Sequence, residues 1–148
     1  MKLLEKIMFK LFEQITVLGS VSFYSILVLF FLALGDYANS IKMIVGMGIM
    51  YTVAIGIRLF YFKPRPEKLK YHSWIEKIDA SSFPSIHSGR AVFLYSFFVS
   101  LTLGNLVNVL FFLLMLTIFF SRIYLKKHYW IDIIAGIVLG GLTSWLVI

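Results

Sequence analysis

Long apolar stretches separated by short polar connections run through most of the chain. A transmembrane helix needs about 20 mostly apolar residues, and five stretches have this character. The predicted spans cover residues 14–34, 41–62, 84–103, 106–124 and 130–148. The connections between them are short, except for a polar stretch over residues 63–83. This pattern predicts an all-α, polytopic membrane helix bundle of about five spans, and we expect residues 1–148 to form a single membrane-embedded domain.

Two segments outside the spans have the spacing of amphipathic helices. The first covers about residues 1–13, and we expect it to lie in the membrane interface. Its apolar face is formed by Leu3, Leu4, Ile7, Leu11 and Phe12, and its polar face by Lys2, Lys6, Lys10 and Glu13. The second follows Pro66 in the polar stretch and carries Tyr71, Trp74, Ile75 and Ile78 at helical spacing. We expect it to form a short surface helix that covers whatever site lies beneath it.

The first span has a second interpretation, as a signal peptide. Ala33-Leu34-Gly35 weakly resembles a cleavage site. The apolar stretch before it, however, exceeds the 7–15 residues of the usual hydrophobic region of a signal peptide. We therefore expect this segment to remain in the protein as a span.

Composition excludes the soluble classes of protein. The chain is 60% hydrophobic and 14% charged, whereas soluble domains are about 45–50% apolar and about 25% charged. So much apolar surface cannot be buried in one small core. The composition also differs strongly from that of a disordered chain, which has few hydrophobic residues. The absence of cysteine excludes thiol catalysis and cysteine-ligated metal sites.

The net charge of +7 is confined to one side of the predicted bundle. All 14 basic residues except Lys42, and all seven acidic residues except Asp36, lie toward the side that holds the N-terminus and the 63–83 stretch. Such a bias predicts that this side faces the cytoplasm. In a membrane protein, positive charge indicates topology, lipid headgroups or an anion site, and we expect no nucleic-acid partner.

Several ionisable side chains gather at this same membrane boundary, although they come from distant parts of the sequence. They are Arg58, Arg65, Ser85, His87, Arg90, Ser121, Arg122, His128 and Asp132. Taken singly, each has an ordinary explanation, because an arginine can extend to the headgroups and a His–Asp pair four residues apart can be structural. Taken together, charged and polar groups at one depth of a membrane protein indicate a functional site.

The residue types in this group favour phosphoryl transfer. Guanidinium groups bind phosphate oxygens with two hydrogen bonds at once. Pro84 can occupy the first turn of a helix, whose free N–H groups would then favour an anion. His87 and His128 suit a proton donor and a nucleophile, and Asp132 can hold one ring nitrogen of His128. Such a site requires neither a metal nor a cofactor.

Three sequence blocks resemble the motifs of the type-2 phosphatidic acid phosphatase family. The first is Arg58, six residues, then Arg65-Pro66, where the family has lysine at the first position. The second is Pro84-Ser85-Ile86-His87, where the family has glycine in place of isoleucine. The third, Ser121-Arg122 followed by His128 and Asp132, matches fully.

The resemblance implies a role for each matching residue. His128 would attack phosphorus to form a phosphohistidine, Asp132 would orient it, and His87 would protonate the leaving oxygen and then activate water. Arg58, Arg65, Arg122, Ser85 and the backbone N–H of Ile86 would hold the phosphate. Lys63 and Ser121 are accessory candidates. Arg90 lies outside the motif, one turn after His87, and we hypothesise that it contacts a second phosphate or another polar part of the headgroup.

The sequence therefore predicts a membrane phosphatase acting on a lipid phosphate or diphosphate. Polyprenyl diphosphate, phosphatidic acid, phosphatidylglycerol phosphate and a lipid A phosphate remain open as substrates. Transfer of the phosphoryl group to another lipid would use the same site. A transporter of an anion or metal, and an inactive relative of the family, are further alternatives.

Overall fold

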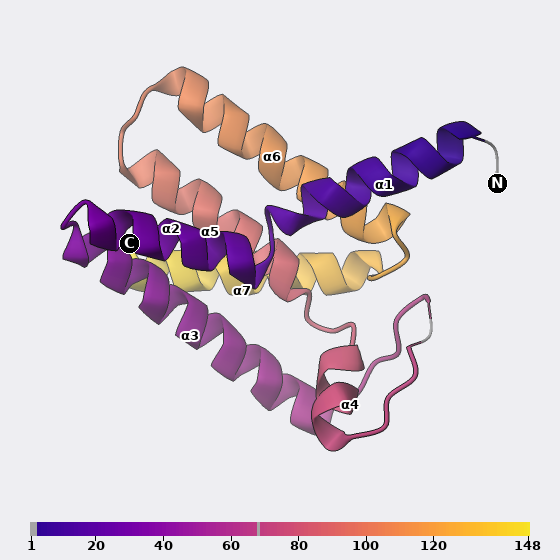
Figure 1. Cartoon of the computed structure of the whole chain (residues 1–148). Coiled ribbons are helices and arrows are strands. Elements are labelled where there is room, and N and C mark those ends of the chain that lie inside the picture. The colour runs from indigo at the N-terminus through magenta and orange to yellow at the C-terminus, as the bar shows by residue number, and fades with distance from the viewer. Residues whose placement is uncertain (1–2, 68) are drawn as a thin grey trace.

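The computed structural model describes residues 3–67 and 69–148, and within them it contains helices and connections but no strand. Met1 and Lys2 of the predicted N-terminal helix, and Lys68 of the 63–83 stretch, lie outside the described residues. The helices are α1 (Leu3–Val17), α2 (Val21–Ala33), α3 (Tyr37–Phe60), α4 (Trp74–Ala80), α5 (Ile86–Ser100), α6 (Asn105–Tyr124) and α7 (Trp130–Val147) (Figure 1). The predicted all-α bundle is confirmed.

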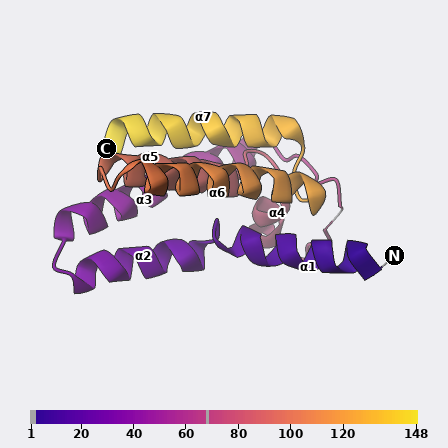
Figure 2. The ribbon, with the colours of Figure 1, turned by 90° about the horizontal axis from the view of Figure 1, so that it is seen from above.

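Helix α5 lies at the centre of this bundle. It packs against α6, α7 and α3, and Figure 2 shows α5 and α6 between α7 on one side and α1 and α2 on the other. With 15 residues it is about 22 Å long, shorter than its neighbours. Because other helices surround it, α5 contacts protein along most of its length.

Four helical segments of the described chain are long and apolar enough to cross a membrane. They are Leu3–Ala33, Tyr37–Phe60, Asn105–Tyr124 and Trp130–Val147. Many large apolar side chains on these segments are exposed, as lipid-facing residues are. The chain is a multi-pass membrane protein.

The boundary predicted near residue 14, between the interfacial helix and the first span, is wrong. Helix α1 continues to Val17, and the break falls at Leu18–Ser20. The backbone N–H groups of these three residues donate to carbonyls three residues earlier, which forms a tight turn. Ser20 then caps α2 by accepting a hydrogen bond from the Phe23 N–H at 3.3 Å.

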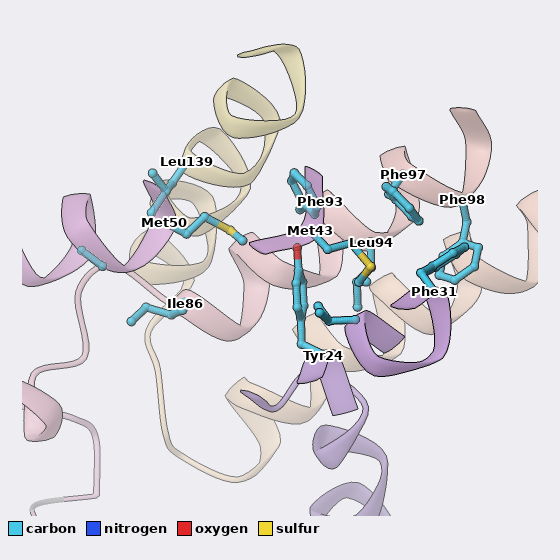
Figure 3. Packing of buried hydrophobic residues seen from close by; sticks show 12 residues of the cluster. Tyr24, Phe31, Met43, Met50, Ile86, Phe93, Leu94, Phe97, Phe98 and Leu139 are labelled. Carbon is cyan, nitrogen blue, oxygen red and sulfur yellow. The ribbon is translucent and has the colours of Figure 1, made fainter. Parts of the chain in front are cut away.

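Methionine and aromatic side chains fill the space between α2, α3 and α5. Met43 and Met50 are fully buried beside Phe93 and Phe97, and Figure 3 shows them in one cluster with Tyr24. Their burial in this cluster identifies both methionines as packing residues. On α5 the cluster extends from Ile86 to Phe98, and it therefore supports the helix that carries His87.

Two glycines allow α7 to approach α5 very closely. A Cβ atom on Gly136 would overlap the Ser85 carbonyl oxygen, and one on Gly140 would overlap the Gly89 carbonyl oxygen. The missing side chains of these two glycines therefore permit the close packing of the two helices. By contrast, nothing lies within 4 Å of a Cβ placed on Gly48 or Gly141.

The polar stretch between α3 and α5 contains the predicted surface helix in a shorter form. Helix α4 begins at Trp74, so Tyr71 precedes it, because the Ser73 hydroxyl caps the helix by accepting from the Glu76 N–H at 3.1 Å. Figure 1 shows α4 beside the C-terminal end of α3. Trp74 and Ile75 are exposed, and Ile75 also lies at the mouth of the cavity described next, together with Ile78 and Asp79.

Candidate active site

A cavity of about 380 Å³ opens where α3, α4, α5 and the turn before α7 meet. It brings together most of the predicted polar site with several apolar residues. Its walls are formed by Tyr51, Ile55, Arg58, Arg65, Ile75, Ile78, Asp79, Ile86, His87, Arg90 and His128. The helix that we expected to cover the site contributes Ile75, Ile78 and Asp79. A headgroup and the start of an apolar tail can thus contact the same cavity.

His128 lies in the turn between α6 and α7 and is almost fully buried. Its Nδ1 atom is 2.7 Å from the carbonyl oxygen of Ser82. Because a carbonyl can only accept a hydrogen bond, Nδ1 carries the proton and Nε2 keeps its lone pair. Burial and the nearby guanidinium groups of Arg122 and Arg65 lower the pKa of His128 to about 2. The ring is therefore neutral at physiological pH, as a nucleophile must be.

Asp132 does not hold the His128 ring in the way the sequence suggested. Its Oδ2 atom is 3.9 Å from His128 Nδ1, beyond hydrogen-bond distance. Oδ2 instead accepts from the Tyr129 N–H at 2.8 Å, and Oδ1 pairs with Lys63 Nζ at 2.6 Å. Both carboxylate oxygens are thus engaged elsewhere, and the carbonyl of Ser82 orients the ring. At 3.9 Å the carboxylate still favours a positive charge on that ring.

Arg58 connects the end of α3 to the segment before α5. Its Nε donates to the Phe83 carbonyl at 3.3 Å and its Nη2 to the Pro84 carbonyl at 3.0 Å. Its Nη1 donates to the Ile78 carbonyl of α4 at 3.4 Å. A guanidinium group has five N–H donors, so two remain for an anion in the cavity.

Arg65 also lines the cavity and keeps more of its donors free than Arg58 does. Its Nη2 donates to the Asp79 carbonyl at 2.6 Å, whereas its buried Nε has no partner. Burial lowers its pKa and the Asp79 carboxylate opposes that change. The side chain stays charged at neutral pH and is available to bind phosphate.

Arg122 is buried near the histidines but is not part of the cavity wall. Its Nη1 contacts Thr16 Oγ1 of α1 at 3.0 Å, and its Nε is buried without a partner. Ser121 does not point into the site, because its hydroxyl donates to the Ile118 carbonyl of its own helix at 2.7 Å. The third motif thus contributes the guanidinium group of Arg122, which is positioned by its hydrogen bond to Thr16 of α1.

The second motif begins α5, which starts at Ile86, two residues after the predicted start at Pro84. Ser85 is the N-cap and accepts from the Ser88 N–H at 3.4 Å, so Pro84 precedes the first turn rather than occupying it. Ile86 is the first helical residue and joins the cavity wall to the buried cluster of Figure 3. His87 follows it, half-buried, with its ring in the cavity wall.

Arg90 is the most deeply buried arginine of the group, with 2% of its surface exposed. Its Nη1 donates to the Tyr51 hydroxyl of α3 at 3.2 Å, while its Nε has no partner. Both side chains line the cavity. The sequence placed Arg90 near the site as an accessory candidate, and the structure brings it into the same cavity as His87.

Three contributors to the site were not found from the sequence. Thr16 is a hydroxyl residue inside an apolar stretch, which was a weak signal. Tyr51 lies seven residues before Arg58, so the two share a face of α3, and this spacing was a usable signal. The Ser82 carbonyl is a backbone group, and no side-chain pattern reveals it.

The described residues contain no group of three or more His, Cys, Asp or Glu side chains that could hold a metal ion. The cations of the site are instead side chains of the protein itself. The reactive groups of the site are the imidazoles of His87 and His128, which lie among arginines. His128, in the turn before α7, is the buried and neutral one. Such an arrangement suits phosphoryl transfer through a covalent imidazole intermediate.

The PAP2 superfamily matches residues 39–148, which include all three motifs, and the chain belongs to this family of membrane phosphatases. A search of curated proteins finds no match.

Two solved structures share its fold. LpxE from Aquifex aeolicus is 19% identical, with a TM-score of 0.74 over 95% of this chain and 84% of that one. A transmembrane PAP2-type phosphatidylglycerolphosphate phosphatase from Bacillus subtilis is 23% identical, with a TM-score of 0.77 over 95% of this chain and 74% of that one.

Proposed function

We propose that the protein hydrolyses a lipid phosphate or diphosphate through a phosphohistidine on His128. The observation that carries this proposal is one cavity whose wall combines His87 and His128 with arginines and with isoleucine side chains. The polar groups suit a phosphate and the apolar ones a lipid tail. Membership of the PAP2 superfamily and the likeness to a phosphatidylglycerolphosphate phosphatase support the same class of substrate.

The reaction proceeds in two steps. In the first, His128 Nε2 attacks phosphorus, the bond from phosphorus to the lipid oxygen breaks, and His87 donates a proton to that oxygen. Arg58, Arg65 and Arg122 stabilise the charge on the phosphoryl oxygens, and the Asp132 carboxylate stabilises the imidazolium. In the second, His87 takes a proton from water, which attacks phosphorus, and the bond to Nε2 breaks to release inorganic phosphate.

The direct test is phosphate release from a panel of lipid phosphates by the detergent-solubilised protein in the presence of EDTA. We expect release from at least one lipid, inhibition by vanadate, and a loss of at least a thousandfold in His128→Ala. No release from any lipid, or release by the variant at the wild-type rate, would reject the proposal. Release that requires a divalent ion would favour a different mechanism.

We also propose that the active site faces the cytoplasm. The support is the distribution of charge, since all basic residues except Lys42 lie toward the end that holds the cavity. Protease treatment of sealed, right-side-out vesicles tests this orientation. Residues 63–83 should resist cleavage until the vesicles are opened, and cleavage in intact vesicles would place the site on the outer face.

A further inference from the structure

Arg90 has a positive charge that the rest of the cavity does not balance. Only 2% of the residue is exposed, and the hydrogen-bond partner that the structure gives its guanidinium group is the neutral hydroxyl of Tyr51. No carboxylate within the described residues pairs with it. A buried charge without a counter-ion is strongly unfavourable, and its buried Nε is also without a partner. The side chain is therefore arranged for an anion that enters the cavity.

The position of Arg90 indicates which part of a substrate this anion is. Helix α5 begins at the catalytic end of the cavity, and Arg90 lies three residues beyond His87, about 4.5 Å further along the axis. Its partner Tyr51 lies seven residues before Arg58 on α3, about 10 Å from it along that axis. Arg90 and Tyr51 thus lie farther along their helices from the α4 loop than His87 and Arg58 do.

The leaving group is expected on that side. On the mechanism proposed above, Arg58 and Arg65 bind the phosphoryl group at the loop end of the cavity, so the rest of the lipid extends toward Arg90 and Tyr51, which line the same cavity. His87 protonates the oxygen that connects the phosphoryl group to the rest of the lipid. A group contacted by Arg90, three residues later on the same face of α5, is attached to that oxygen.

We propose, on the basis of the function proposed above, that Arg90 and Tyr51 form a subsite for a second phosphate and that the preferred substrate is a lipid diphosphate. His128 Nε2 forms a bond to the terminal phosphorus, and the bond from that phosphorus to the bridging oxygen breaks. The electron pair stays on the bridging oxygen, which accepts a proton from His87 and leaves as part of a lipid monophosphate. Arg90 stabilises the charge on this leaving phosphate. Water then releases the terminal phosphate from His128.

A monophosphate lipid places an uncharged ester group beside Arg90. The guanidinium group then remains buried without an anion, and this lowers the affinity for the transition state. The subsite therefore selects by headgroup and not by the chemistry of the tail. Selection by the headgroup and selection by the tail can be separated with two pairs of lipids. The members of each pair have the same tail and differ only in carrying one or two phosphates.

The experiment measures kcat/KM for the full chain in detergent with geranylgeranyl monophosphate and diphosphate, and with phosphatidic acid and diacylglycerol diphosphate. The wild-type protein should prefer the diphosphate at least tenfold in both pairs. In Arg90→Gln both activities should fall, and the preference should drop by about 10- to 100-fold, the effect of losing a charge-assisted hydrogen bond. A wild-type ratio near one, or a ratio unchanged in the variant, would overturn the proposal.

Two further variants exclude a purely structural role for Arg90. Arg90→Lys keeps the charge but loses the planar fork, and it should reduce the preference about threefold to tenfold. If Arg90→Gln does not fold, Arg90→Lys tests the subsite in its place. An unchanged ratio of diphosphate to monophosphate kcat/KM in Arg90→Lys would contradict the subsite. Tyr51→Phe removes the neutral partner and should change the ratio less than Arg90→Gln does. An equal change would mean that Arg90 acts only by holding Tyr51. Release from no lipid by the wild type would instead reject the proposed function itself.

Discussion

Lys63 and Asp132 form an ion pair across 69 residues of sequence, with 2.6 Å between Nζ and Oδ1. Asp132 is completely buried, and Lys63 connects the loop after α3 to the first turn of α7. This pair explains why Asp132 is not at hydrogen-bond distance from His128. It also fixes the turn that carries His128 relative to the arginines of the loop.

Removal of Lys63 should therefore destabilise the protein. In Lys63→Met the buried Asp132 loses its counter-ion, which we expect to cost about 3–5 kcal/mol of unfolding free energy. The matched control is Lys127→Met, since Lys127 pairs with Glu67 at 3.4 Å on the surface and should contribute less than about 1 kcal/mol. Thermal unfolding in detergent measures both. Equal losses in the two variants would show that the buried pair is not stabilising.

Thr16 should act on catalysis through Arg122. Thr16→Val keeps the shape of the side chain but removes the contact to Arg122 Nη1. We expect kcat/KM for lipid phosphate to fall about threefold to tenfold, the effect of losing one hydrogen bond, with little change in unfolding temperature. Thr117→Val is the control, because the Thr117 hydroxyl bonds to Leu113 in its own helix. If both variants retain full activity, Thr16 does not position Arg122.

Close packing of α5 on α7 should depend on Gly140. In Gly140→Ala the new methyl group meets the backbone of Gly89, and the resulting displacement should cost about 1–3 kcal/mol. Gly141→Ala is the neighbouring control, since nothing lies within 4 Å of its Cβ, and we expect its stability to be unchanged or slightly higher. A stable Gly140→Ala protein with wild-type activity would contradict the close approach of these helices.

The buried, neutral state of His128 should make stability depend on pH. Its pKa is about 2 in the folded protein and about 6.5 without burial, so below pH 6.5 the unfolded chain binds a proton that the folded protein does not. Stability is therefore lost as pH falls, by about 1 kcal/mol per pH unit from this residue. Unfolding between pH 7.5 and 5 should show a smaller decrease in His128→Asn than in the wild type. Identical decreases would mean that His128 is not neutral in the fold.

Much of the site followed from the sequence for a clear physical reason. Charged residues cannot lie in the middle of a membrane at low cost, so Arg58, His87 and His128 had to gather at one end of the spans. The spacing of each motif then placed these residues on helix ends that face the same loop. The order of the long apolar spans could be predicted from hydropathy.

Other parts of the site depend on contacts that no local pattern describes. Thr16 and Arg122 are 106 residues apart, and their contact depends on how α1 packs against α6. The Ser82 carbonyl meets His128 because the loop before α5 adopts one particular path. The break at Leu18–Ser20 lies inside an apolar stretch, where hydropathy alone gives no boundary. Each of these features is set by tertiary packing.

In the proposed mechanism His128 carries the phosphoryl group during turnover. Rapid quenching of the protein with a lipid substrate radiolabelled on its terminal phosphate would trap this intermediate. We expect a transient label on the protein that is stable in base, lost in acid, located on His128 by mass spectrometry, and absent from His128→Asn. Steady phosphate release by the wild type without any such label, or a label of the same size in His128→Asn, would contradict it.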